Sequence, residues 1–156
     1  MSTPILTAAA FQHAAIAWVE TLEQQALATG QALDDRELAL ADHVGVRYPE
    51  RIRILELDAF PQPPEPELHA AARAVGLLGP DTVGLTTGYG ILLRWGSRAD
   101  ARVFSHECRH VSQYESAGSA AAFLKEYIGQ VVQFGYRNSP LEQDARAHER
   151  LAFLSS

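Results

Sequence analysis

The segment His106-Glu107-Cys108-Arg109-His110 has the pattern H-E-x-x-H, in which two histidines are four residues apart. On an α-helix, side chains with this spacing lie one above the other, so the two imidazoles can bind one metal ion together. The chain must therefore adopt a fold that presents such a helix to a further ligand. Glu107 lies on the flank of the histidine face. There it can take a proton from a water molecule whose pKa zinc lowers to about 7.

The residues around the motif predict a helix over about residues 98–116. Ser97 and Asp100 supply an N-terminal capping signal, and Gly118 supplies a C-terminal one. Four residues on the side opposite the histidines mark a core face: Ala101, Phe104, Cys108 and Val111. A metal-binding helix requires histidines outside the core face. The alternative is a surface helix that carries His and Glu by chance.

Composition and net charge exclude several classes of protein and of metal site. The chain has 156 residues, of which 47% are apolar and 21% charged, so we expect residues 1–156 to form a single domain with an ample core. The net charge of −6 argues against a nucleic-acid or anionic-membrane partner. A single cysteine excludes an internal disulfide and a Cys-rich zinc site. Cys108 itself is expected to be a buried apolar residue.

The N-terminal region shows no targeting signal. No Lys or Arg precedes Arg36, and the apolar stretches there are far shorter than a signal peptide or a membrane span. We therefore expect a cytoplasmic protein without a membrane segment.

The rest of the chain mixes helix and strand signals. Period-two alternation predicts a strand over residues 51–57, with a bulge or with both faces covered, and strand material over residues 83–95 that Gly88-Tyr89-Gly90 can fold into a hairpin. Apolar spacing predicts helices over residues 11–26, 35–44, 65–75, 123–132 and 140–153. A peptide substrate would lie along an exposed strand edge beside the metal. An ordinary sheet without a ligand is the alternative.

A catalytic zinc site needs one more protein ligand besides the two histidines and a water molecule. A metzincin would have Gly and His where this chain has Gln113 and Ser116, so that class is excluded. The third ligand must come from further along the chain. Gln113 and Arg109 are expected on the rim of the motif, as solvated or scaffolding residues.

Two segments together resemble the gluzincins, which are zinc peptidases with a glutamate as third ligand. The segments are H-E-x-x-H-V-x-Q-Y at residues 106–114 and Y-R-N-S-P-L-E-Q-D-A at residues 136–145. The resemblance covers roughly residues 80–150 and is strongest to the short, single-domain bacterial members. It implies a zincin-like α+β domain of helices with a small sheet. It also implies that Glu142, in an E-x-x-A context with Ala145, is the third zinc ligand.

Two roles for Glu142 remain open. As a ligand it would project from the helix over residues 140–153 toward the histidines. Alternatively, Ser139 caps this helix, Pro140 is its first residue, and Glu142 bonds back to the Ser139 N–H in a capping box. Asp144 is the other close carboxylate, about 200° around the helix from Glu142.

The predicted function is hydrolysis of peptide bonds in a peptide or protein substrate. Zinc would be held by His106, His110 and Glu142, while Glu107 acts as general base and then passes its proton to the leaving amine. Candidate donors to the oxyanion are Tyr89, Tyr114, Tyr136 and His148. One alternative is a non-catalytic zinc-binding or partner-binding module. The other is a structural protein whose histidines bind nothing.

Overall fold

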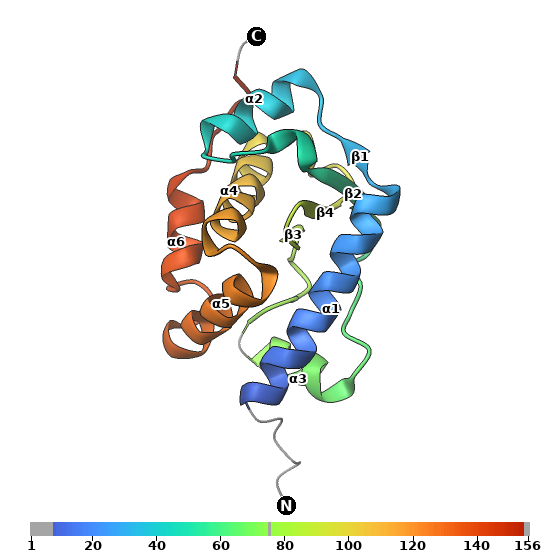
Figure 1. Ribbon diagram of the computed structural model, residues 1–156, viewed down its shortest axis with the longest axis vertical. Helices are drawn as coiled ribbons and strands as arrows, with labels where there is room; N and C mark the ends of the chain where they lie inside the picture. The colour runs from blue at the N-terminus through green and yellow to red at the C-terminus, as the bar shows by residue number, and fades with distance from the viewer. Residues whose placement is uncertain (1–7, 75, 155–156) are drawn as a thin grey trace, which may run out of the picture.

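The computed structural model describes residues 8–74 and 76–154, which form six α-helices and a small four-stranded mixed sheet (Figure 1). The helices are α1 (Ala8–Thr29), α2 (Asp35–His43), α3 (Pro66–Ala74), α4 (Ala101–Ala117), α5 (Ala120–Phe134) and α6 (Pro140–Ala147). The strands are β1 (Gln31–Ala32), β2 (Arg53–Leu57), β3 (Gly84–Thr86) and β4 (Gly90–Arg94), and a 3₁₀ turn η1 (Pro49–Arg51) precedes β2. The predicted α+β class is confirmed.

The strands are ordered β1-β2-β4-β3 across the sheet. The central strands β2 and β4 are parallel, with Ile54 opposite Ile91, whereas the outer pairs are antiparallel. Strands β3 and β4 form the hairpin predicted around Gly88, which has a φ of +118° that favours glycine. This topology puts β3 at the edge of the sheet, beside the helix that carries the histidines.

Both faces of the sheet are covered. Ile54, Ile91 and Leu93 pack with residues of α2 and α4 in the largest apolar cluster. Leu92 points the other way and packs with Leu22 of α1. Helices α1 and α4 accordingly lie on opposite sides of the strands (Figure 1). Strands covered on both faces carry apolar residues at consecutive positions, which explains the phase change predicted within residues 51–57.

Local capping signals set the limits of α4. The Asp100 carboxylate accepts hydrogen bonds from the backbone N–H groups of Arg102 and Val103, and Gly118 ends the helix with a φ of +90°. The predicted start at residue 98 is therefore early, because Asp100 rather than Ser97 is the cap. The predicted core face is confirmed, since each of its members is at most 5% exposed: Ala101, Phe104, Cys108 and Val111.

The C-terminal helix is shorter than the predicted residues 140–153, because α6 ends at Ala147. Beyond this helix the chain turns back toward α4, where the Arg150 N–H donates to Ser105 Oγ. The Ser139 side chain makes no capping bond to α6; its hydroxyl donates instead to the Tyr136 carbonyl. The capping box proposed for Glu142 is therefore absent. For α3, the predicted last residue, Val75, lies outside the described residues.

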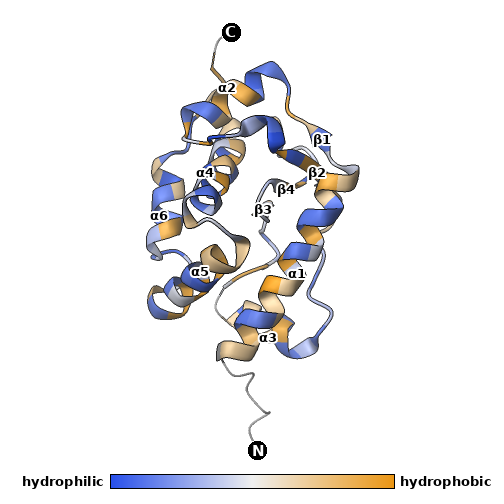
Figure 2. Cartoon of the chain, in the orientation of Figure 1, coloured by the Kyte–Doolittle hydropathy of each residue, from blue (hydrophilic) through white to orange (hydrophobic). Residues whose placement is uncertain are grey.

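The longer helices carry hydrophobic and hydrophilic residues in alternation along their lengths (Figure 2). In α1 the buried residues recur every three or four positions: Phe11, Ala15, Val19, Leu22 and Ala26. Such helices cover a core with one face and meet water with the other. Within the described part of the chain, no helix is both long and apolar enough to cross a membrane.

Candidate metal centre

Helices α4 and α6 pack against each other (Figure 1). Their side chains bring three potential ligands together. The Nε2 atom of His106 lies 3.1 Å from Glu142 Oε1, and the Nε2 atom of His110 lies 3.0 Å from Glu142 Oε2. The candidate ligand atoms of the three residues all lie within 4.8 Å of one another. The structure thus brings together the two histidines of the motif and the glutamate that the gluzincin resemblance implies as third ligand.

The hydrogen bonds of Gln113 determine which nitrogen of His110 carries a proton. Its Nε2 donates to the Leu141 carbonyl at 3.0 Å and to Asp144 Oδ2 at 2.8 Å, and both partners are acceptors. The amide oxygen therefore faces His110 Nδ1, at 2.7 Å, and accepts the proton on that nitrogen. In the neutral imidazole, the other ring nitrogen of His110, Nε2, would then present a lone pair toward Glu142.

His106 is oriented in the same way by a carboxylate. Its Nδ1 lies 2.8 Å from Glu149 Oε2, so this nitrogen donates a proton and Nε2 faces Glu142. Metal-binding histidines usually donate their second ring N–H to a carboxylate or carbonyl, which fixes the ring and raises its basicity. Glu149 lies just beyond the end of α6, in the turn that follows Ala147. Its spacing from His106 in the sequence does not indicate this contact.

This donor set fits a metal cation. In the neutral imidazoles, two nitrogen lone pairs would face the oxygens of one buried carboxylate, an arrangement that needs positive charge between them. Tetrahedral zinc with bonds of 2.0–2.2 Å separates neighbouring N and O ligands by about 3.3–3.6 Å, a few tenths of an ångström more than the 3.1 and 3.0 Å seen here. Three protein ligands also leave one coordination position for water or substrate, as in catalytic zinc sites.

Without a metal, protons supply that positive charge. Burial lowers the pKa of His106, but the hydrogen bond and charge of Glu142, the charge of Glu107 and the bond to Glu149 together raise it to about 9. Burial also lowers the pKa of His110, yet contact with Glu142 raises it above its ordinary value. Burial would raise the pKa of Glu142, whereas hydrogen bonds from both histidines hold it far below its usual range. Glu142 is therefore an anion that demands a cationic partner.

Tyr127 on α5 also holds Glu142 in place. Its hydroxyl donates to Glu142 Oε2 at 2.7 Å. Burial, followed by the charge of Glu142, raises the pKa of Tyr127 well above its ordinary value, so the hydroxyl keeps its proton. In the sequence Tyr127 belongs to the apolar face of a helix, and nothing in that pattern indicates a role at the site.

Glu107 lies beside the ligands and is held by the edge strand β3. Its carboxylate Oε1 lies 2.9 Å from the Thr86 hydroxyl, which is also 3.0 Å from the Glu107 backbone carbonyl. A Cβ atom on Gly84 would come within 2.9 Å of three atoms of the Glu107 side chain. Glycine at position 84 therefore provides the space that Glu107 occupies.

The candidate centre thus combines three ligands, two groups that orient the histidines and a neighbouring carboxylate. No protein family model, curated protein or solved structure matches the chain. What the group can do chemically follows from its own donor atoms and their surroundings.

Of the four predicted oxyanion donors, one lies beside the ligands and three are bound elsewhere. Tyr136 lines the space beside Glu107 and Glu142. The remaining three donors have other partners: Tyr114 donates to the Thr86 carbonyl, Tyr89 to Glu115, and His148 Nδ1 bonds to the Asp144 carbonyl. Tyr136 is therefore the predicted oxyanion donor that the fold brings closest to the ligands.

Asp144 is directed away from the ligand group, as its place on the helix predicts. Its carboxylate accepts from Arg109 Nε at 2.8 Å and from Gln113 Nε2. The hydrogen bonds and charge of these partners, above all Arg109, outweigh burial and lower the pKa of Asp144. Asp144, Arg109 and Gln113 therefore form a scaffold behind His110, and Glu142 is the carboxylate that meets both imidazoles.

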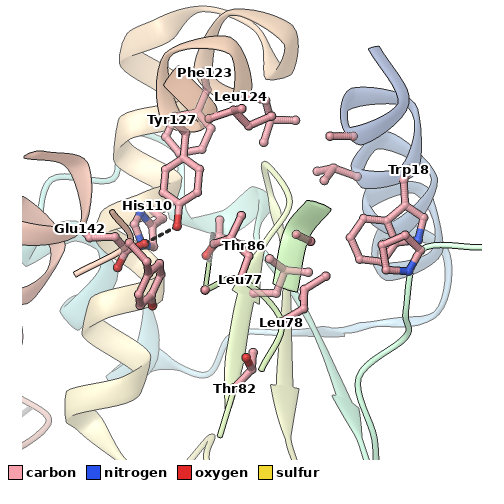
Figure 3. Close-up of a pocket in the computed structure, with 18 of the residues that line it drawn as sticks. Trp18, Leu77, Leu78, Thr82, Thr86, His110, Phe123, Leu124, Tyr127 and Glu142 are labelled. Atoms are coloured by element: carbon pink, nitrogen blue, oxygen red, sulfur yellow. Dashed lines mark hydrogen bonds and ion pairs between the residues drawn. The ribbon is translucent and has the colours of Figure 1, made fainter. Parts of the chain in front are cut away.

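Two hollows meet at Glu107. The first, which we call the apolar cavity, measures about 130 Å³ and extends from Glu142 toward α1 and α5 (Figure 3). The second, the polar cleft, measures about 220 Å³ and is lined by charged side chains that include Arg102, Arg146 and Glu149. Both hollows include Glu107 in their walls, so this side chain lies between them.

Proposed function

We propose that the chain is a zinc-dependent metallopeptidase with a zincin-like fold. The observation that carries this proposal is the arrangement around Glu142, where two histidine Nε2 atoms face one carboxylate while both Nδ1 atoms are held by acceptors. The H-E-x-x-H motif, the downstream glutamate and the edge strand beside α4 are consistent with the gluzincin resemblance.

His106, His110 and Glu142 would hold the zinc ion. Zinc in such a site supplies a Lewis acid that polarises a peptide carbonyl and lowers the pKa of a water molecule to about 7. Glu107 takes a proton from the attacking water as the water oxygen bonds to the carbonyl carbon. The C–N bond then breaks, and Glu107 returns the proton to the leaving amine.

The positioning of Glu107 and the hydroxyl of Tyr136 support these steps. Thr86 and the space above Gly84 keep the Glu107 carboxylate beside the ligands. Burial, and after it the charges of Glu142 and Glu107, raise the pKa of Tyr136, so its hydroxyl is protonated at neutral pH. It can then donate to the oxygen that becomes negative during the reaction.

A non-catalytic zinc-binding module is the second candidate. The observation that favours it is the environment of Glu107, whose side chain is hydrogen-bonded to Thr86 and only 7% exposed. A general base must reach water, and a base sealed against a strand would leave a site that holds zinc without turnover.

The variant Glu107→Gln separates the two candidates. For a peptidase, the variant binds zinc as the wild type does but loses hydrolysis of a broad peptide library, because the base is removed and every ligand stays. Asp42→Asn, at the far end of α2, is a carboxylate-to-amide control that should keep both properties. A wild-type protein that binds zinc and cleaves no peptide in the library would support the non-catalytic module.

A further inference from the structure

The apolar cavity is built by parts of the chain that are far apart in sequence. Figure 3 shows Trp18 of α1 on one side, Phe123, Leu124 and Tyr127 of α5 on another, and His110 with Glu142 at one end. Leu77 and Leu78 from the loop after α3 complete the wall near Thr82 and Thr86. The cavity therefore joins the candidate metal centre to a space between α1, α3 and α5.

Most of the polar groups in this wall lie at the end next to the candidate centre, where several of them are already paired (Figure 3). The charged side chains that line the cavity belong to the candidate centre: Glu107, His110 and Glu142. Three hydroxyl groups also have partners, because Tyr127 donates to Glu142, Thr86 to Glu107, and Tyr114 to the Thr86 carbonyl. The deeper wall is apolar, and its residues include Phe11, Leu68, Phe123 and Ile128.

Such a wall selects the chemistry of what it can hold. A charged or strongly polar group placed deep in the cavity would lose its hydration among mostly apolar side chains, which costs several kcal/mol. An apolar group would exchange water for contact with aliphatic and aromatic side chains. The volume sets the size, since an apolar cavity of about 150 Å³ holds one benzene molecule.

We propose that the apolar cavity binds one uncharged, apolar side chain of the substrate, of the size of leucine or phenylalanine, next to the peptide bond that is cleaved. This specificity rests on the proposed peptidase function, because the candidate metal centre at one end of the cavity defines where that bond lies (Figure 3). Peptides with Leu or Phe beside the cleaved bond are the substrates, and peptides with Asp, Lys or Gly at that position are not.

Binding of hydroxamates to the zinc-loaded protein tests this proposal without relying on turnover. The hydroxamate group binds zinc, and the attached chain probes the cavity. Affinity measured by calorimetry should rise about fourfold per added methylene group from acetohydroxamate to 3-methylbutanohydroxamate. It should be high for phenylacetohydroxamate and should rise no further for dodecanohydroxamate, whose chain exceeds about 130 Å³.

A pair of variants on α3 ties the effect to this cavity. Ala72 lines the cavity and is 5% exposed, whereas Ala70 lies on the exposed face of the same helix. Ala72→Leu should leave acetohydroxamate binding unchanged and weaken phenylacetohydroxamate at least tenfold. Ala70→Leu should change neither affinity. Ala15→Leu fills the cavity from α1 and repeats the test if Ala72→Leu does not fold.

Each outcome decides one point. An affinity that is flat from acetohydroxamate to phenylacetohydroxamate would show that the cavity is an internal packing void and would overturn the proposal. An affinity that rises steadily with chain length up to dodecanohydroxamate would overturn the size limit and indicate a channel for long acyl chains. Failure of acetohydroxamate itself to bind would contradict the metal centre and the specificity that rests on it.

Discussion

Gln113 offers the most detailed test of how the site is organised. Its amide makes three hydrogen bonds, to His110 Nδ1 at 2.7 Å, to the Leu141 carbonyl at 3.0 Å and to Asp144 at 2.8 Å. Gln113→Ala removes all three bonds and leaves the His110 ring free to rotate and to exchange tautomers. The substitution therefore acts on both the metal site and the packing of α4 against α6.

The magnitudes follow from these contacts. Loss of a group that orients a metal ligand typically weakens metal binding about tenfold to 100-fold, or roughly 1.4–2.8 kcal/mol. Three hydrogen bonds at about 1 kcal/mol each give a loss of about 3 kcal/mol in the free energy of unfolding. Gln113→Glu restores an acceptor for His110 but places a carboxylate oxygen near Asp144. This variant should lose stability yet keep more zinc affinity than Gln113→Ala.

Competition with a chromophoric chelator measures the zinc affinity of each variant, and urea unfolding of the metal-free protein measures stability. Gln143→Ala is the control, because Gln143 is exposed on α6 and should change neither quantity. Wild-type zinc affinity in Gln113→Ala, together with a large loss of stability, would refute the reasoning. Gln113 would then hold two helices together without setting the tautomer of His110.

Three further predictions concern neighbouring groups. Glu142→Gln should weaken zinc binding by at least 100-fold, whereas Asp144→Asn should weaken it far less. A chelator competition that found the reverse order would assign the ligand role to Asp144. Thr86→Val should keep zinc affinity and lower kcat/KM about tenfold, because Glu107 loses its hydrogen bond; unchanged kinetics would show that Thr86 does not position the base. The raised pKa of His106, about 9, keeps it protonated at pH 7.5 in the metal-free protein, so zinc binding should release at least one proton and tighten from pH 7 to pH 9. Calorimetry in buffers of different ionisation enthalpy that found no proton release would contradict that charge state.

Much of the local structure could be predicted because its causes are local. Asp100 and Gly118 define α4 through contacts within one helical turn, and the i, i+4 spacing alone places the two histidines together. Apolar spacing likewise predicted the strands β3 and β4 and the core face of α4, and Gly88-Tyr89-Gly90 indicated where a hairpin could form. The limit of this reasoning appears at α6, where a helical pattern was extended past Ala147 although the chain turns to meet α4.

The surroundings of the ligands could not be predicted, because they depend on contacts between distant segments. Glu149 meets His106 across 43 positions, Thr86 meets Glu107 across 21, and Tyr127 meets Glu142 across 15. None of these pairs has a characteristic spacing. Tyr127 illustrates the difficulty. A tyrosine on an apolar helix face looks like a core residue in the sequence, and only the structure shows that its hydroxyl donates to Glu142.

The central claim is that His106, His110 and Glu142 bind zinc, and metal analysis of the purified protein tests it most directly. Elemental analysis by mass spectrometry, after dialysis against metal-free buffer, should find about one zinc ion per chain in the wild type. His106→Ala and His110→Ala should each lose it, while His13→Ala, on the exposed face of α1, should retain it. A wild-type protein that holds no zinc after zinc is supplied, or histidine variants that keep a full equivalent, would contradict the account.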